Sequence, residues 1–291
     1  TYTANWTANT YNITFNTDGG STIANSTYTT STSAITKSLG TPTKTGYSFL
    51  NWTVAWTDST HSTTLPTVSG TTLTIPANAY GHITLKAVWS VNAQGLTVMS
   101  YANTVANSAF VFDENAVGGT VKIGSGTAGA KANQDVNYGT KITITASANA
   151  HYKFVGWYLN DTKVSDSASY EITMGATNAT YIARFEVITN TVTVNIPSNC
   201  SIVLATDDST SDYSSVLDSS TQKETFSFKE GATPKFEVRP NTGYRVSQII
   251  INSTTVVVSN DNITDDSAKT YQFPALTSNQ TLTATIVARA Y

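Results

Sequence analysis

Few residues of this sequence have the types and spacing that chemistry requires. The three histidines, His61, His82 and His151, lie in separate segments, and none has a Cys or His partner at metal-site spacing. Ser and Asp residues are too numerous and too scattered to define a Ser-His-Asp triad. No glycine-rich phosphate loop precedes a helix, because no amphipathic helix is evident. The sequence therefore nominates no catalytic residue, and we expect no enzymatic activity.

Two acidic loops contain the oxygen ligands that calcium prefers. Their residues are Asp207, Asp208 and Asp212 in one loop, and Asp261, Asn262, Asp265 and Asp266 in the other. Neither loop follows a known calcium-binding pattern, and Asp, Asn and Ser also favour turns for local reasons. Calcium binding is thus a hypothesis beside the simpler prediction of turns, and no other cofactor is expected.

Trp56 is the one candidate contact for a ligand. A sugar-binding platform needs an exposed aromatic ring, whereas Trp52, Trp89 and Trp157 recur at matched positions of a repeated pattern, as core residues do. Trp56 has no such counterpart. The sequence leaves two alternatives open for Trp56, a place in a core or a contact with a carbohydrate.

The composition favours a protein outside the cell. Charged residues make up 12% of the chain and the formal net charge is −3, whereas soluble domains typically contain about 25% charged residues. A net negative charge gives no basis for binding nucleic acid, and no apolar run is long enough to span a membrane. The single cysteine, Cys200, excludes a disulfide within the chain, and no neighbouring base would activate its thiol. We predict a cell-surface or secreted location.

The elements that must position any site are short strands in a repeated order. The pattern large apolar, any, Ala, any, large apolar occurs at residues 85–89, 181–185 and 282–286, and also at 2–6. Its period of two is that of a half-buried β-strand, and its recurrence is that of tandem modules. We predict an all-β chain with little or no helix, made of three small antiparallel modules. The predicted boundaries are 10–91, 92–187 and 188–291, with residues 1–9 as the closing strand of a preceding module.

Each predicted module follows one plan. A first strand is expected at residues 11–15, 120–123 and 191–194, and a corner follows at Gly46-Tyr47, His151-Tyr152 and Gly243-Tyr244. After each corner an apolar spacing of three interrupts the alternation, which predicts a β-bulge, and Gly156 suits one. Residues 96–112 are extra to the plan and predict a hairpin in the second module. Residues 205–220 are rich in Asp and Ser and predict a long surface loop.

The aromatic residues of these patterns define two predicted cores. Tyr47, Phe49, Trp52 and Trp89 are expected to pack together in the first module. Tyr152, Phe154, Trp157 and Phe185 are expected to do so in the second.

The first module resembles the Listeria–Bacteroides repeat, the B-repeat of internalin-type bacterial surface proteins. The resemblance rests on residues 11–20, 42–52 and 83–89, with Gly46-Tyr47 and Trp52 as its centre. The second module, through Gly156-Trp157 to Phe185, is similar to the divergent branch of that family. The third keeps Gly243-Tyr244 but lacks the Trp. The resemblance implies small β-grasp-like or Ig-like modules, strung in tandem in surface proteins, with roles in spacing, stalks and adhesion and with no catalytic residues.

We therefore predict a non-catalytic structural repeat protein, acting as a stalk, a spacer or a fibre-forming segment. The alternative is an adhesin or a carbohydrate-binding module. The expected partners are copies of the chain or neighbouring repeats, and the alternative adds surface glycans or proteins of host or neighbouring cells.

Residues 2–6 add a hypothesis about assembly. Tyr2, Ala4 and Trp6 match the closing strand of a module that the chain does not contain, and such a strand needs a sheet to pair with. It can fold onto the first module as an edge strand or complete a sheet in another copy by strand addition. Head-to-tail strand addition would produce a fibre. Residues 1–91 carry only five charges, at Asp18, Lys37, Lys44, Asp58 and Lys86, so little repulsion opposes it.

Overall fold

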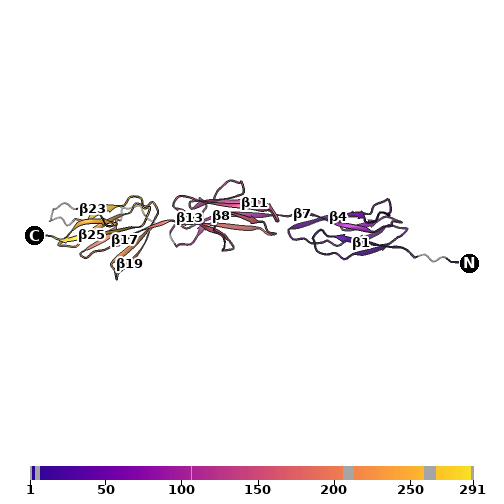
Figure 1. The fold of residues 1–291 in the computed structure, drawn as a ribbon, viewed down its shortest axis with the longest axis horizontal. Helices are drawn as coiled ribbons and strands as arrows, with labels where there is room; N and C mark the ends of the chain where they lie inside the picture. Colours follow the sequence, from indigo (N-terminus) through magenta and orange to yellow (C-terminus); the bar gives the residue numbers. More distant parts are fainter. Residues whose placement is uncertain (1, 4–6, 106, 206–212, 259–266, 290–291) are drawn as a thin grey trace. The chain divides into compact units, whose positions relative to one another are not determined.

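The computed structural model describes residues 2–3, 7–105, 107–205, 213–258 and 267–289. These residues form strands and turns and contain no helix, which confirms the predicted all-β fold (Figure 1). A helix that could cross a membrane is consequently absent from this part of the chain. By contacts the chain divides into two compact units, Thr1–Leu96 with Gln134–Ile142 and Ile172–Ala179, and the remainder. The division into three modules stays a prediction.

The sheets draw their strands from three consecutive stretches. The first stretch contains β1 (Thr10–Asn16), β2 (Ser26–Thr29), β3 (Ile35–Ser38), β4 (Tyr47–Trp56), β5 (Thr67–Ser69), β6 (Thr72–Ile75) and β7 (Ile83–Val91). They form one sheet of order β2-β1-β7-β4 and a second of order β3-β6-β5. Alternation of apolar and polar residues places Ile13, Leu73, Ile83 and Leu85 in the core, fully buried.

The second stretch repeats this order with additions. Its strands are β8 (Ala93–Ala102), β9 (Val111–Phe112), β10 (Gly119–Ile123), β11 (Lys131–Asn137), β12 (Lys141–Ala148), β13 (Tyr152–Leu159), β14 (Thr162–Ser165), β15 (Ser169–Thr173) and β16 (Ala179–Val187). The sheet orders are β11-β8-β16-β13-β14 and β10-β12-β15, and β9 pairs with β8.

The third stretch has the same core order again. Its strands are β17 (Thr189–Asn195), β18 (Cys200–Leu204), β19 (Tyr213–Asp218), β20 (Lys223–Lys229), β21 (Lys235–Pro240), β22 (Tyr244–Ile251), β23 (Thr254–Val258), β24 (Lys269–Gln272) and β25 (Gln280–Ala288). The orders are β19-β20-β17-β25-β22-β23 and β18-β21-β24. In every stretch the closing strand, β7, β16 or β25, lies between the first strand and the strand that follows the corner.

The pairing of β1 with β7 and that of β17 with β25 are parallel, although the sequence predicted antiparallel modules. β1 runs parallel to β7, with Ile13 opposite Ile83, and β17 runs parallel to β25, with Val192 opposite Gln280. A parallel pair needs a long crossover connection, and here all the intervening strands of the stretch supply it. Alternation along a strand is the same in both orientations, so the sequence pattern could not distinguish them.

The predicted first strand of the second stretch is wrong. Residues 120–123 belong to β10, which pairs with β12 in the smaller sheet. The counterpart of β1 and β17 is β8, since β8 is the neighbour of the closing strand β16. The predicted hairpin is present, because Tyr101 pairs with Phe112, but its first strand is a regular part of the sheet. Both β8 and β10 alternate buried and half-buried residues, so periodicity favoured neither.

The predicted surface loop at 205–220 is also partly wrong. Residues 213–218 form β19, which pairs with β20 along its whole length. Tyr, Val and Leu favour a strand there, whereas the surrounding Asp and Ser residues favoured a loop.

The predicted β-bulges are confirmed. The register shifts between Phe49 and Asn51, between Phe154 and Gly156, and between Val246 and Gln248. Gly156 has φ +153°, and a Cβ there would lie 2.9 Å from the carbonyl oxygen of Ser165. A side chain would therefore collide with the backbone at this bulge.

Candidate functional site

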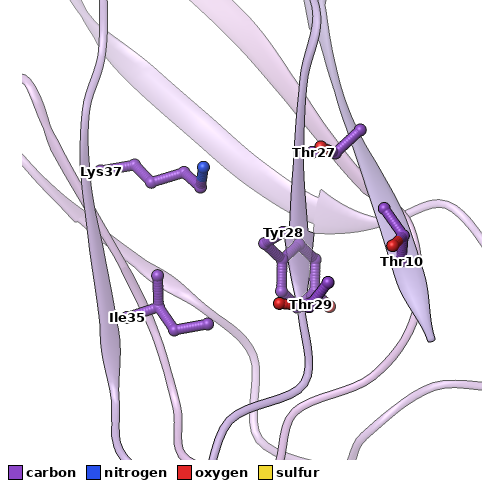
Figure 2. Close-up of a pocket in the computed structure, with 6 residues that line it drawn as sticks. All are labelled: Thr10, Thr27, Tyr28, Thr29, Ile35 and Lys37. Atoms are coloured by element: carbon purple, nitrogen blue, oxygen red, sulfur yellow. The ribbon is translucent and has the colours of Figure 1, made fainter. Parts of the chain in front are cut away.

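A shallow pocket lies between β2 and β3, which are edge strands of the two sheets of the first stretch (Figure 2). Its lining residues are Thr10, Thr27, Tyr28, Thr29, Ile35 and Lys37. Sequence reasoning missed this pocket because its residues come from separate strands and match no motif. The residues come together only because the two sheets pack against each other.

Tyr28 forms the floor of the pocket. Its side chain is 4% exposed, and its hydroxyl donates a hydrogen bond to the carbonyl oxygen of Gly81 at 2.7 Å. Burial, with smaller contributions from Tyr11 and Asp58, raises the pKa of Tyr28 from 10.0 to about 12. Burial has this effect because it penalises the charged phenolate.

This pKa shift predicts a loss of stability at high pH. The folded-state pKa lies above the unfolded value, so the contribution of Tyr28 is complete below pH 10.0 and is lost as the pH rises toward about 12. In the Tyr28→Phe variant the free energy of unfolding should fall by about 1 kcal/mol at neutral pH, because the hydrogen bond to Gly81 is lost. Its stability should also decline less steeply above pH 10.0 than that of the wild type. Urea unfolding at several pH values measures both effects, with Tyr80→Phe, at an exposed tyrosine, as the control. Equal alkaline slopes in wild type and Tyr28→Phe would contradict the prediction.

Lys37 brings a cation to the same pocket. Its side chain extends from β3 into the space beside Tyr28 and is half-buried (Figure 2). Among the residues that the structure describes, no carboxylate forms an ion pair with it. The ammonium group can bind an anionic ligand at this pocket, and the lining of the pocket also includes three threonines. The simpler interpretation is protection of an edge strand, because an inward-pointing charge discourages pairing with another chain.

Trp56 is half-buried at the end of β4. Its ring stacks on His61 at a centroid distance of 5.5 Å and an interplanar angle of 15°, so one face is covered. Its Nε1 atom is buried and has no hydrogen-bond partner within the described ranges. Trp56 also packs against the core of the first stretch. Its role as a ligand contact stays a hypothesis.

The other sequence candidates fall largely outside the described residues. This is so for all six Asp residues of the calcium hypothesis and for Ala4 and Trp6 of the assembly hypothesis. Tyr2 is described and fully exposed. In the ranges that the structure describes, no three His, Cys, Asp or Glu side chains cluster in a way that could hold a metal ion. Burial raises the pKa of the Cys200 thiol, which disfavours the reactive thiolate.

Most of the predicted aromatic clusters form. Trp52 and Trp157 are buried, Phe49 contacts both Trp52 and Trp89, and Phe154 contacts both Trp157 and Phe185. Tyr47 is the exception in the first cluster. Its ring lies 5.9 Å from that of Tyr138 instead of packing with the tryptophans.

The corner residues receive a recurring hydrogen bond. The carbonyl oxygens of Gly46, His151 and Gly243 accept from the backbone N–H groups of Asn92, Ile188 and Arg289, the residues that follow the closing strands. The three corner residues have φ of +78°, +65° and +85°. His151 thus adopts the turn conformation predicted from its alignment with glycines, and its Nδ1 lies 3.3 Å from a carboxylate oxygen of Glu230.

These features define an all-β protein built from a repeated sheet order. Residues 11–77 match the family model of the Listeria-Bacteroides repeat domain, and residues 115–189 match that of the divergent InlB B-repeat domain. The resemblance predicted from the sequence is therefore confirmed for these stretches. Such repeats point to a structural protein of the bacterial surface.

Comparison with solved structures gives distant matches. The TIE protein of Bacillus anthracis is 10% identical with a TM-score of 0.34, and the match covers 95% of this chain and 50% of that one. The fimbrial anchor protein Mfa2 of Porphyromonas gingivalis is 12% identical with a TM-score of 0.22, covering 64% of this chain and 100% of the other. The shaft pilin SpaA of Lactobacillus rhamnosus GG, in a mutant form, is 11% identical with a TM-score of 0.21, covering 69% and 100%. This chain thus spans about half the length of the TIE protein, and no curated protein matches it.

Proposed function

We propose that this chain is a stalk or spacer segment of an extracellular bacterial protein, built to carry tension along the chain. The supporting observation is the parallel pairing of the first and closing strands in the first and third stretches. The chain enters the first stretch through β1 and leaves it through β7, and these neighbours run in the same direction. Tension applied to the two ends therefore pulls the strands past each other along their length.

Shear of this kind loads several hydrogen bonds at once. The paired residues run from Ile13 opposite Ile83 to Asn16 opposite Lys86. Each hydrogen bond contributes only about 0.5–1.5 kcal/mol to stability, but bonds that share a load must break together. β17 and β25 repeat the arrangement from Val192 opposite Gln280 to Val194 opposite Leu282.

Short links between the stretches also favour a role in transmitting force. A single residue, Asn92, separates β7 from β8, and a single residue, Ile188, separates β16 from β17. The carbonyl oxygen of Asn92 accepts a hydrogen bond from the N–H of Tyr138, and that of Ile188 accepts one from the N–H of Glu230. Links of this length leave little slack to extend under tension.

Pulling one fold in two directions tests the proposal. The first protein carries Thr10→Cys and Ser90→Cys, so that tension shears β1 against β7. The second carries Ser48→Cys and Ser90→Cys, which lie opposite each other on the antiparallel strands β4 and β7, so that tension opens those bonds one after another. Both proteins also carry Cys200→Ser and are kept reduced. In single-molecule force spectroscopy the first should unfold at a clearly higher force than the second.

The design holds the fold and its stability nearly constant, because Thr10, Ser48 and Ser90 are exposed. Forced unfolding is governed by the unfolding barrier along the pulling direction rather than by equilibrium stability. Equal rupture forces in the two directions would rule out a shear-resistant stalk.

A second candidate function is adhesion to a glycan, and the pocket of Figure 2 supports it. Lys37 and the threonines that also line the pocket suit an acidic sugar, which combines a carboxylate with ring hydroxyls. Binding on an array of acidic and neutral glycans should then weaken in the Lys37→Ala variant and persist in Lys86→Ala, at an exposed lysine. Weakening in Trp56→Ala instead would place the contact at Trp56. Absence of binding to every glycan would eliminate this candidate.

Copies of the chain or neighbouring repeats are the partners we propose for the stalk. Host or neighbouring-cell proteins belong to the adhesin alternative. Strand addition by Tyr2, Ala4 and Trp6 is part of the same proposal. Each closing strand lies between two neighbouring strands of its sheet. A strand with the same pattern would therefore insert into a module that lacks its own closing strand, and it would pair there on both sides.

A further inference from the structure

We propose that β19 is a self-association edge, where two copies of the chain join their sheets by antiparallel pairing of β19 with β19. The inference concerns lateral contact between copies and does not depend on the stalk proposal. It starts from the position of β19 at the outer end of the sheet β19-β20-β17-β25-β22-β23. The edge strand of a sheet presents unpaired backbone N–H and C=O groups that another strand can satisfy.

The side chains of β19 are unusually exposed to solvent for a strand that contains large apolar residues. All six residues are exposed, with Val216 72% exposed and Leu217 58% exposed. Tyr213 lies against the buried rings of Phe226 and Phe228, so its face of the strand continues the core-facing side of the sheet. Leu217 shares that face by alternation, whereas Val216 points to the opposite face. A strand added beside β19 would cover apolar surface on both faces.

β19 lacks the protection that other edge strands carry. It pairs with β20 from Tyr213 opposite Phe228 to Asp218 opposite Lys223 without a register shift. β23, at the other end of this sheet, pairs through a register shift. β14 and β2, edge strands of two other sheets, are each only four residues long. Charges, bulges and short length are the usual means of preventing association between edges.

The one charge of β19 is engaged within its own turn. The Asp218 carboxylate accepts hydrogen bonds from the hydroxyls of Ser220 and Thr221, at 2.6 and 2.7 Å. The carboxylate therefore stabilises the turn into β20 and does not oppose pairing of another strand at the free edge of β19.

The sequence of β19 is compatible with its own copy. A two-fold axis through Val216 places Val216 opposite Val216, Ser215 opposite Leu217, and Ser214 opposite Asp218 of the second copy. No two like charges are then opposite each other, and the central pair is β-branched, which favours cross-strand packing. Such a contact is closed and symmetric, so it produces dimers and not open chains.

The test compares the full chain with single variants by sedimentation over a wide range of concentration. The wild type should form dimers. Val216→Lys should weaken the dimer about tenfold or more, because it places two ammonium groups opposite each other at the axis. Val216→Thr should retain the dimer, because Thr is β-branched and uncharged. The matched control, Val117→Lys, makes the same change at an exposed valine outside β19 and should dimerise like the wild type.

A second measurement uses the unaltered protein. Hydrogen exchange of the amides at residues 213–218 should slow as the concentration rises, while exchange at β23 stays the same. A wild type that remains monomeric at millimolar concentration would overturn the proposal, as would unchanged dimerisation of Val216→Lys. Loss of association on deleting residues 1–8, with Val216→Lys still associating, would overturn it in favour of the amino-terminal strand.

Discussion

Replacing Trp157 with alanine should abolish one thermal unfolding transition of the chain and leave the others unchanged. Trp157 is fully buried, and its Nε1 donates a hydrogen bond to the carbonyl oxygen of Ala168. Truncating such a side chain costs about 3–5 kcal/mol in cavity and transfer terms. Small domains have total stabilities near the lower end of about 5–15 kcal/mol, so the affected module should unfold near room temperature.

Differential scanning calorimetry measures this result, because independent modules give separate transitions. Trp56→Ala is the matched control, since it removes a half-buried tryptophan from the first stretch. Trp56→Ala should lower the midpoint temperature of a different transition, and by a smaller amount. If Trp157→Ala shifts all transitions together, residues 92–187 do not form an independent module.

Replacing Phe236 with alanine should abolish a different thermal transition, because the loss of stability should be similar to that in Trp157→Ala. Phe236 is fully buried, and its ring lies 5.1 Å from that of Phe226 and 6.0 Å from that of Phe273. Loss of a ring at the centre of such a cluster costs about 3–5 kcal/mol. Phe112→Ala, at a partly exposed ring, should cost much less.

The pair of variants tests the division of the chain. If the predicted modules 92–187 and 188–291 unfold independently, the combined Trp157→Ala and Phe236→Ala variant should lose both transitions, and the two effects should add. One common transition that falls with either substitution would show instead that the two stretches unfold as one cooperative unit.

Sequence patterns were sufficient for the strands that recur. The corner at Gly46-Tyr47 and the bulge at Gly156 were predictable because left-handed backbone and interrupted alternation restrict residue type. The family resemblance followed from the same residues. These features are local, so a single sequence contains them.

What the sequence did not reveal depends on long-range pairing. Nothing in the alternation of β1 indicates that it pairs with β7 in parallel, and nothing in residues 93–102 marks β8 as the strand beside β16. The third core was also not foreseen. Ile249 replaces the tryptophan, and aromatic residues from β20 and β21, Phe226, Phe228 and Phe236, fill the space instead.

The pocket of Figure 2 illustrates the same limit for function. Tyr28 and Lys37 are ordinary strand residues in the sequence, and they become neighbours only because two edge strands of different sheets meet. Trp56 was nominated because it lacked a counterpart, and its stacking on His61 could not be inferred from that.

The central position of the closing strands also governs the order in which the chain can fold. Synthesis proceeds from the amino terminus, so β1 and β4 emerge before β7, the strand that must lie between them. Until β7 emerges, the larger sheet remains split into two parts with unpaired inner edges. Each stretch should therefore complete its sheet late and in one step, as soon as its final strand is released. If a ribosome or an export channel pauses before that strand, the two inner edges stay unpaired, and the closing strand of a neighbouring copy can pair with them.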